Sequence, residues 1–181
     1  MSVKITYFAH GTTTDNEKGL STGWAQDELS SLGITQAKKL GKLVANKIFD
    51  AVFSSDFKRA LDTARLAFGD KYNITQDERL RESNYGDFTQ KPAKTFKQNL
   101  AIYVKNPFPN GESYLDVEKR VKSFLTFLKK NYLGKNIAIV AHEAPQLALE
   151  VLLKNKTWED AIKENWRDKK AWQPGWEYLI K

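Results

Sequence analysis

The sequence predicts an α/β protein, a three-layer α/β/α sandwich with a mostly parallel central sheet in a single domain. Short apolar runs typical of buried strands alternate along the chain with amphipathic helical patterns. This alternation is typical of a parallel sheet whose two faces are both covered by helices. The length of 181 residues suits one well-buried domain and is short for two. We therefore expect residues 1–181 to form one domain.

The first strand is predicted at residues 3–9, where an apolar run ends abruptly at His10 and Gly11. A loop is expected from there to about Gly33, followed by a helix at about 35–47 with apolar residues spaced three and four apart. The apolar stripe of this helix consists of Ala37, Leu40, Val44 and Ile48.

The next elements are predicted to be a strand at 51–54, a helix that runs to about Phe68, and a short strand at 73–76. Ser55 or Asp56 is the expected N-cap of this helix, because short polar side chains accept hydrogen bonds from the first free backbone N–H groups.

The second half of the chain contains the clearest helical pattern. Val117, Val121 and Leu128 belong to its apolar stripe, Ser113 with Asp116 predicts a capping box at its start, and Gly134 is expected to close it. A strand at 136–141, helices at about 145–153 and 157–166, and a last strand at 177–180 complete the alternation.

The two histidines of the chain, His10 and His142, each follow an alanine at the end of a predicted strand. Ligands of open α/β sheets bind beyond the carboxyl ends of the strands. A single histidine there could be a stray loop residue, but two with no others in the chain predict a functional site at this edge.

Other kinds of catalytic site are weakly supported. The chain has no cysteine, which excludes thiolate chemistry and disulfides. It has no G-x-S-x-G elbow for a Ser-His-Asp triad, and the spacing of the two histidines does not match a zinc motif. We expect no metal and no cofactor.

A phosphate-binding site accounts for more of the residues near these strand ends than a Ser-His-Asp triad or a zinc site does. Gly11 allows close approach of the backbone to an oxyanion, and Thr12, Thr13 and Asn16 can donate hydrogen bonds. Arg59 is predicted in the first turn of a helix at the same edge, where a guanidinium can bind phosphate through two parallel hydrogen bonds. For Arg59 alone, a surface position would be the simpler interpretation.

Five segments in order resemble the histidine phosphatase superfamily, the phosphoglycerate-mutase-like phosphatases. They are "AHGTTTDNEKGLSTGWAQDELSSLGITQA", "SSDFKRALDTA", "LRESNYGDF", "PNGESYLDVEKRV" and "IVAHEAPQLAL". Each motif is weak alone, but together they cover about four-fifths of the chain. The resemblance implies that His10 is the nucleophile, Arg59 a phosphate-binding arginine, Glu82 the proton donor and His142 the second catalytic histidine.

The resemblance also implies a metal-independent phosphomonoesterase that forms a phosphohistidine. The residues expected to bind the phosphate or the rest of the substrate are Gly11, Thr12, Asn16, Thr22, Gly23 and Glu143.

The chain departs from the family pattern at two positions. The family has arginine before the nucleophile and usually glycine after the second histidine, and this chain has Ala9 and Glu143 there. The arginine normally holds the transferring phosphoryl group. Two interpretations stay open: a phosphatase of low activity, and an impaired homologue that binds phosphorylated ligands or acts on another anion.

Composition gives no sign of a nucleic-acid or membrane partner. The net charge is +7, but Lys and Arg are scattered among acidic residues, as on a solvated surface. The alternative interpretation is a positively charged pocket entrance that attracts a phosphorylated anion. No apolar run approaches the roughly 20 residues needed to span a bilayer. We expect a cytoplasmic enzyme with a small phosphorylated substrate, as a monomer or a dimer.

Two segments are expected to lie outside the sandwich itself. Residues 85–109 form a short cap over the pocket, with lysines and aromatic residues in its composition. Residues 158–181 form a tryptophan-rich C-terminal segment. We expect it to pack on the core as a flap, with a ligand-stacking or partner surface as the alternative.

Overall fold

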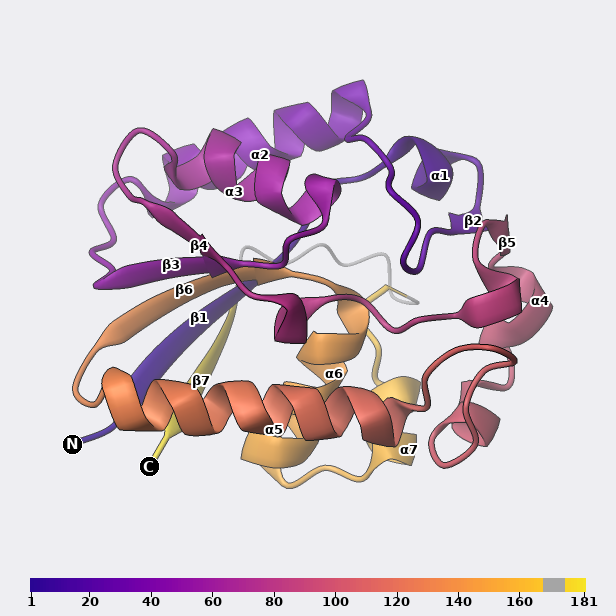
Figure 1. Cartoon of the computed structure of the whole chain (residues 1–181). Coiled ribbons are helices and arrows are strands. Elements are labelled where there is room, and N and C mark those ends of the chain that lie inside the picture. Colours follow the sequence, from indigo (N-terminus) through magenta and orange to yellow (C-terminus); the bar gives the residue numbers. More distant parts are fainter. Residues whose placement is uncertain (168–174) are drawn as a thin grey trace.

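The centre of the molecule is a five-stranded sheet with the strand order β4-β3-β6-β1-β7 (Figure 1). The structure, a computed structural model, describes residues 1–167 and 175–181. Strands β4, β3, β6 and β1 run parallel, and β7 pairs antiparallel with β1. The strands are β1 (Val3–Ala9), β3 (Ala51–Ser54), β4 (Ile74–Gln76), β6 (Asn136–Ala141) and β7 (Trp176–Ile180). The expected mostly parallel sheet is confirmed.

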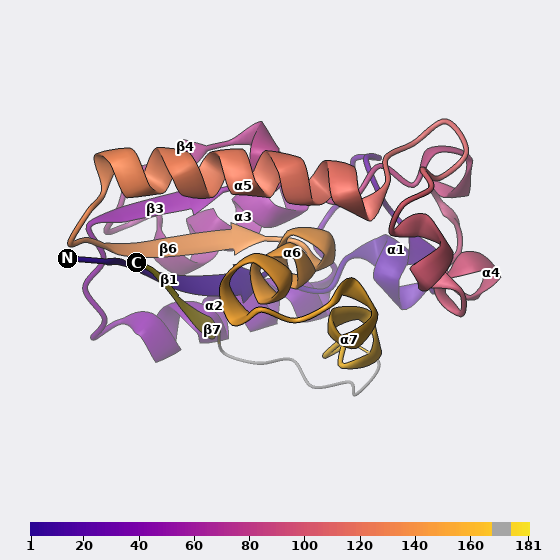
Figure 2. The same cartoon turned by 90° about the horizontal axis from the view of Figure 1, so that it is seen from below.

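Helices cover both faces of the sheet, as Figures 1 and 2 show. Because side chains alternate along a strand, Phe8 packs into the cluster on one face and Tyr7 into the cluster on the other. The expected three layers are therefore confirmed. The helices of one face are α2 (Ser31–Val44) and α3 (Lys58–Phe68), and those of the other are α5 (Tyr114–Asn131) and α6 (Glu143–Lys154), with α7 (Trp158–Lys163) packed against α6.

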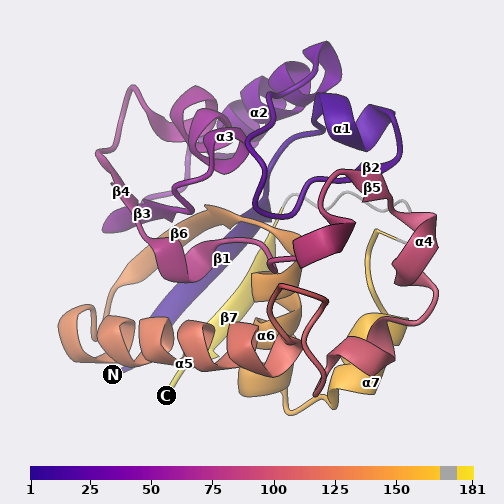
Figure 3. The same cartoon turned by 45° about the vertical axis from the view of Figure 1, so that its right-hand side comes forward.

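A group of short elements lies beyond the carboxyl ends of the strands (Figure 3). Strand β2 in the first loop pairs antiparallel with β5 in the expected cap region, so two segments far apart in sequence form a second, two-stranded sheet. The elements are α1 (Thr14–Glu17), β2 (Leu20–Ser21), β5 (Lys91–Pro92) and α4 (Lys94–Lys97), with the 3-10 helices η1 (Glu78–Leu80), η2 (Gly86–Phe88) and η3 (Leu100–Tyr103).

The first predicted loop and helix need correction. The loop contains α1 and β2, and α2 begins at Ser31, earlier than expected, because the Ser30 hydroxyl accepts a hydrogen bond from the Gly33 N–H at 3.2 Å. The helix ends at Val44, so Ile48 is not part of its buried stripe and is 78% exposed.

The predicted N-cap of α3 is also wrong. Phe57 occupies the N-cap position and makes no side-chain capping bond. The Ser55 hydroxyl accepts from the Phe57 N–H at 3.3 Å, and Asp56 accepts from the Arg81 Nε–H at 2.9 Å. Both polar side chains are thus used just before the helix rather than on its first turn.

The elements of the second half agree better with the sequence. Ser113 and Asp116 form the predicted capping box of α5. Helix α6 begins at Glu143, earlier than expected, and α7 ends at Lys163 rather than near Trp166. No helix in the described part of the chain is long and apolar enough to cross a bilayer.

In the C-terminal segment, the rings of Trp166 and Trp176 pack with their centroids 5.4 Å apart. Trp172, another of the four tryptophans of this segment, lies outside the described residues.

Tyr7 connects β1 to the residue that follows β6. Its hydroxyl donates to the His142 carbonyl at 2.6 Å and accepts from the His142 N–H at 2.9 Å. Tyr7→Phe leaves both backbone groups unpaired in the interior, and we expect it to lower the free energy of unfolding by about 1–3 kcal/mol in urea denaturation. Tyr132→Phe is the control, because no hydrogen bond of the Tyr132 hydroxyl occurs among the described residues. Equal effects of the two substitutions would contradict the prediction.

Candidate functional site

His10 and His142 lie next to each other at the carboxyl edge of the sheet. Their strands β1 and β6 are parallel neighbours, with Ala9 opposite Ala141, and the His10 N–H donates to the Ala141 carbonyl at 3.0 Å. The ring centroids of the two histidines are 5.1 Å apart. The strand pairing therefore brings together the two residues that the sequence placed at strand ends.

The hydrogen bond of the His10 ring determines its tautomer. Nδ1 lies 2.7 Å from the Gly11 carbonyl oxygen, which can only accept, so Nδ1 carries the proton. Burial, and then the positive charges of Arg59 and Arg167, hold the pKa of His10 well below its usual 6.5. The ring is therefore neutral at pH 7, and its Nε2 carries a free lone pair.

His142 is a buried imidazole whose hydrogen bonds are unmade. It is 0% exposed, and neither ring nitrogen has a hydrogen-bond partner among the described residues. Burial, followed by Arg59 and His10, lowers the pKa of this histidine well below 6.5. Leaving a buried polar group unpaired is costly, and such groups in native proteins often have a functional explanation. The described part of the chain therefore leaves both ring nitrogens of His142 buried and without a partner, 5.1 Å from His10 between the ring centroids.

Arg59 projects from the first turn of α3 and is buried. Its Nη1 donates to the Ala25 carbonyl at 3.0 Å and its Nη2 to the Gly23 carbonyl at 2.7 Å. Burial lowers the pKa of Arg59 to about 10, so the guanidinium stays charged at neutral pH. Arg59 thus holds the loop that contains Gly23 and places a positive charge in the cavity that His10 also lines.

Glu82 is fixed at the N-terminus of α6. Its Oε1 accepts from the Ser83 N–H at 2.9 Å and the Ala144 N–H at 3.0 Å, and its Oε2 accepts from the Glu143 N–H at 3.2 Å. The carboxyl group therefore satisfies helix-terminal N–H groups that would otherwise be free to bind an anion.

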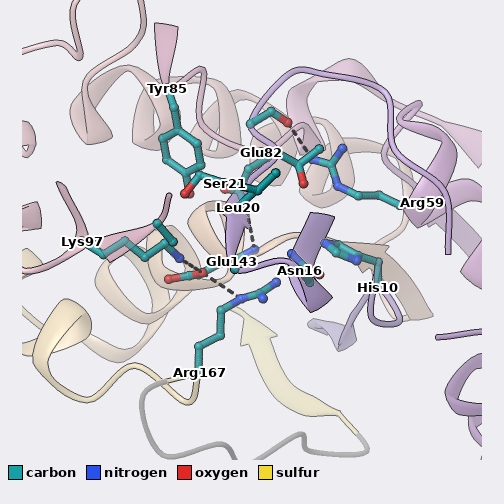
Figure 4. A pocket seen from close by; sticks show the side chains of 14 residues that line it. His10, Asn16, Leu20, Ser21, Arg59, Glu82, Tyr85, Lys97, Glu143 and Arg167 are labelled. Carbon is teal, nitrogen blue, oxygen red and sulfur yellow. Dashed lines mark hydrogen bonds and ion pairs between the residues drawn. The ribbon is translucent and has the colours of Figure 1, made fainter. Parts of the chain in front are cut away.

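A cavity of about 160 Å³ lies among these side chains (Figure 4). The predicted site residues that line it are His10, Asn16, Thr22, Gly23, Arg59, Glu82 and Glu143. Gly11, Thr12 and His142 do not line it, although the rings of His142 and His10 are neighbours. The roles of these residues toward a substrate stay predictions.

Gly11 and Thr12 make contacts with the scaffold. The Gly11 N–H donates to the Thr63 hydroxyl at 3.0 Å, and a Cβ on Gly11 would lie 2.6 Å from the Gly33 carbonyl oxygen. The Thr12 N–H donates to Gln36 Oε1 at 2.8 Å. The close packing of Gly11 on Gly33 is a structural reason for glycine at this position.

The cavity contains two cations outside the predicted site residues: Arg167, which the sequence did not indicate, and Lys97, which was expected only as one of the lysines of the cap region. Both pair with Glu143: Lys97 Nζ lies 3.0 Å and Arg167 Nε 2.8 Å from its Oε2, and Asn165 donates to its Oε1. Burial alone would raise the pKa of Glu143, but the charges of Lys97 and Arg167 outweigh it and lower the pKa to about 2. The position of Glu143 directly after His142 was the one signal in the sequence for a buried ion pair here. This signal does not identify Lys97 and Arg167 as the partners.

The described residues contain no group of three or more His, Cys, Asp or Glu side chains arranged to hold a metal ion.

The two buried histidines predict a loss of stability in mild acid. Their pKa values lie well below 6.5 in the folded protein but near 6.5 in the unfolded chain. As the pH falls below 6.5, the unfolded chain therefore takes up protons that the folded state does not, and the free energy of unfolding falls. Each histidine contributes a slope of up to about 1.4 kcal/mol per pH unit, and the contribution vanishes above about pH 7.

Urea denaturation between pH 7.5 and 5.5 measures this slope. His142→Gln should reduce the slope, because it removes one of the two groups. A slope that is the same in the variant and in the original chain would contradict the assignment.

Comparisons with known proteins agree with this geometry. The family model described as "Histidine phosphatase superfamily (branch 1)" matches residues 7–175. A 2,3-bisphosphoglycerate-dependent phosphoglycerate mutase of Rhizobium meliloti is 31% identical over 91% of this chain and 86% of the relative. The adenosylcobalamin/alpha-ribazole phosphatase of Escherichia coli is 30% identical over 78% of this chain and 74% of the relative.

Solved structures show the same fold. The crystal structure of the alpha-ribazole phosphatase from Shigella flexneri matches with a TM-score of 0.76 and 29% identity, over 87% of this chain and 83% of that one. The relatives of this chain are thus phosphatases and mutases. The chain belongs to branch 1 of the histidine phosphatase superfamily.

Proposed function

We propose that the protein is a phosphatase that hydrolyses a small phosphorylated metabolite through a phosphohistidine on His10. The observation that carries the proposal is the tautomer of His10: Nδ1 donates to the Gly11 carbonyl, so Nε2 is the nucleophilic nitrogen. The named activities of the relatives support the same chemistry. A cavity of about 160 Å³ supports a small substrate, because pockets for larger ligands are roughly 300–1,000 Å³.

In the proposed first step, His10 Nε2 forms a bond to phosphorus while the bond from phosphorus to the leaving oxygen breaks. Glu82 gives its proton to that oxygen. In the second step, water attacks the phosphohistidine, Glu82 takes the proton of the water, and the bond between phosphorus and nitrogen breaks. Free phosphate and the original His10 result.

The negative charge of the phosphoryl group needs fixed positive charge and hydrogen-bond donors. Arg59 supplies a buried guanidinium, and the unpaired ring nitrogens of His142 can take part once a phosphoryl group lies beside His10. The proposed reaction is independent of metal, because these side chains can provide the charge. Location in the cytoplasm, the absence of nucleic-acid and membrane partners, and the choice between monomer and dimer stay predictions.

A second candidate function is the binding of a phosphorylated ligand without turnover, or action on another anion. The sequence observation that favours it is Ala9, which brings no charge to the strand end before His10. Losing one positioned charge donor typically lowers a rate by roughly 10²–10³-fold. We therefore expect low activity rather than none, because His10, Arg59 and Glu82 still meet at one cavity.

Trapping the intermediate tests the nucleophile. During turnover of a phosphate ester in EDTA, we expect an acid-labile, base-stable phosphoryl group on His10, located by mass spectrometry of peptides. His10→Gln should abolish both the adduct and the hydrolysis. His142→Gln is the matched control, because it removes the other histidine but leaves the proposed nucleophile.

An active His10→Gln protein, or an adduct on His142, would overturn the proposed role. Turnover that requires added divalent metal would overturn the metal-independent mechanism. Binding of phosphate esters with no turnover on a broad panel would favour the second candidate.

A further inference from the structure

Three segments that are distant in sequence meet at Glu143, on one wall of the cavity. Lys97 comes from the end of α4, Arg167 from the segment after α7, and Glu143 is the first residue of α6. Figure 4 shows Lys97 and Arg167 reaching the Glu143 carboxylate from different sides, with Arg167 directed toward the part of the cavity that holds His10 and Asn16. The arrangement is a buried carboxylate that holds two cations beside the proposed nucleophile.

Arg167 contributes one of the three positive charges that line the cavity. The charged lining residues are the cations Arg59, Lys97 and Arg167 and the carboxylic acids Glu82 and Glu143. Three cations thus face two carboxyl groups, and the loss of any one cation, Arg167 included, lowers the charge of the lining by one. A cavity without net positive charge is poorly suited to a phosphate group. Arg167 is thus one of three cations that make the lining suitable for an anion.

Arg167 has unused hydrogen-bonding capacity. A guanidinium has five N–H donors. Its Nε lies 2.8 Å from Glu143 Oε2, yet this contact lacks hydrogen-bond geometry, and the buried Nε has no hydrogen bond within the described residues. The structure gives no hydrogen bond from Nη1 or Nη2 to a described residue. Glu143 thus holds the charge of Arg167 in place, while no residue in the described part of the chain accepts a hydrogen bond from its two terminal nitrogens.

Two more buried donors line the same cavity. The hydroxyl groups of Ser21 and Thr22 have no hydrogen-bond partner among the described residues, and the two residues are 4% and 5% exposed. Hydroxyl and guanidinium donors around one small cavity fit an oxyanion. The carboxylate of Glu143 has only acceptors, so it cannot itself bind phosphate and acts on an anion through its cations.

We propose that Arg167 binds the phosphate group of the substrate, and that Glu143 is the positioning residue that holds the guanidinium in the cavity. The C-terminal segment thereby supplies the cation that Ala9 does not bring from the end of β1. This inference deepens the proposed function, because it concerns the phosphate site of the same cavity. The role of Arg167 is the same whether the protein hydrolyses the phosphorylated ligand or only binds it.

Binding of inorganic phosphate tests the proposal without relying on turnover. We expect Arg167→Gln to weaken phosphate binding, measured by calorimetry, by roughly 10- to 100-fold, the loss expected for a charge-assisted contact. The phosphate affinity of Arg167→Lys should lie between that of the original chain and that of Arg167→Gln, because lysine keeps the positive charge but lacks the planar guanidinium. Arg65→Gln is the matched control: Arg65 is an exposed arginine of α3, with a side chain 60% accessible, and it does not line the cavity.

Glu143→Gln separates positioning from charge. Removing a carboxylate beside an anion should tighten phosphate binding if charge alone matters, whereas loss of positioning should weaken it. We expect weaker binding than in the original chain. In the Arg167→Gln background, where there is no guanidinium to position, the same substitution should not weaken binding further. Tighter binding by the single variant would overturn the positioning role of Glu143.

A measurement on the original chain covers the case in which Arg167→Gln does not fold. In a protein with ¹⁵N-labelled arginine, the Nε resonance that disappears in Arg167→Lys should shift as phosphate is added. No shift, or unchanged phosphate affinity in a folded Arg167→Gln protein, would overturn the proposal even if the enzyme hydrolyses phosphate esters. If the original chain shows no turnover but Arg167→Gln binds phosphate more weakly, the phosphate contact of Arg167 is supported and the proposed hydrolysis is refuted.

Discussion

The parallel pairing of β1 with β6 is the constraint on which the rest of the site depends. Its register sets Ala9 against Ala141, so the first residue after each strand is a histidine at the same edge of the sheet. The Tyr7 hydroxyl bridges the backbone of His142 across this pair. A shift of one residue in this register would separate the rings and turn the side chains of one strand to the opposite face. The register of the sheet thus determines the positions of both imidazoles.

Buried charge is organised around the N-terminus of α6. Glu82 accepts the first N–H groups of that helix, and Glu143 begins the helix as a second buried carboxylate. Buried charges are costly unless they are paired and hydrogen-bonded. Glu143 meets this requirement through Lys97 and Arg167, which come from the cap region and the C-terminal segment. One ion-pair cluster therefore ties both of these segments to the sandwich and also sets the charge of the cavity.

Local signals in the sequence predicted much of the architecture. The alternation of apolar strands and amphipathic helices predicted the parallel sheet and its layers, and Ser113 with Asp116 predicted the start of α5. Errors arose where several local signals competed. Ser55 and Asp56 both look like N-caps, but Asp56 pairs with Arg81 and Ser55 binds the Phe57 N–H, so the N-cap is Phe57, one residue after Asp56 and two after Ser55. Ile48 continues a helical spacing beyond the point where the helix ends.

The sequence by itself determined that His10 and His142 lie at strand ends, and its motifs indicated Arg59 and Glu82 as their companions. This was possible because the position of a residue after a strand is a local property of the chain. Only the tertiary structure decided the tautomer of His10, the use of Glu82 at a helix end, and the meeting of Lys97 and Arg167 at Glu143. These features depend on contacts between segments far apart in sequence, and side-chain charge pairs of this kind leave no periodic pattern from which they could be predicted.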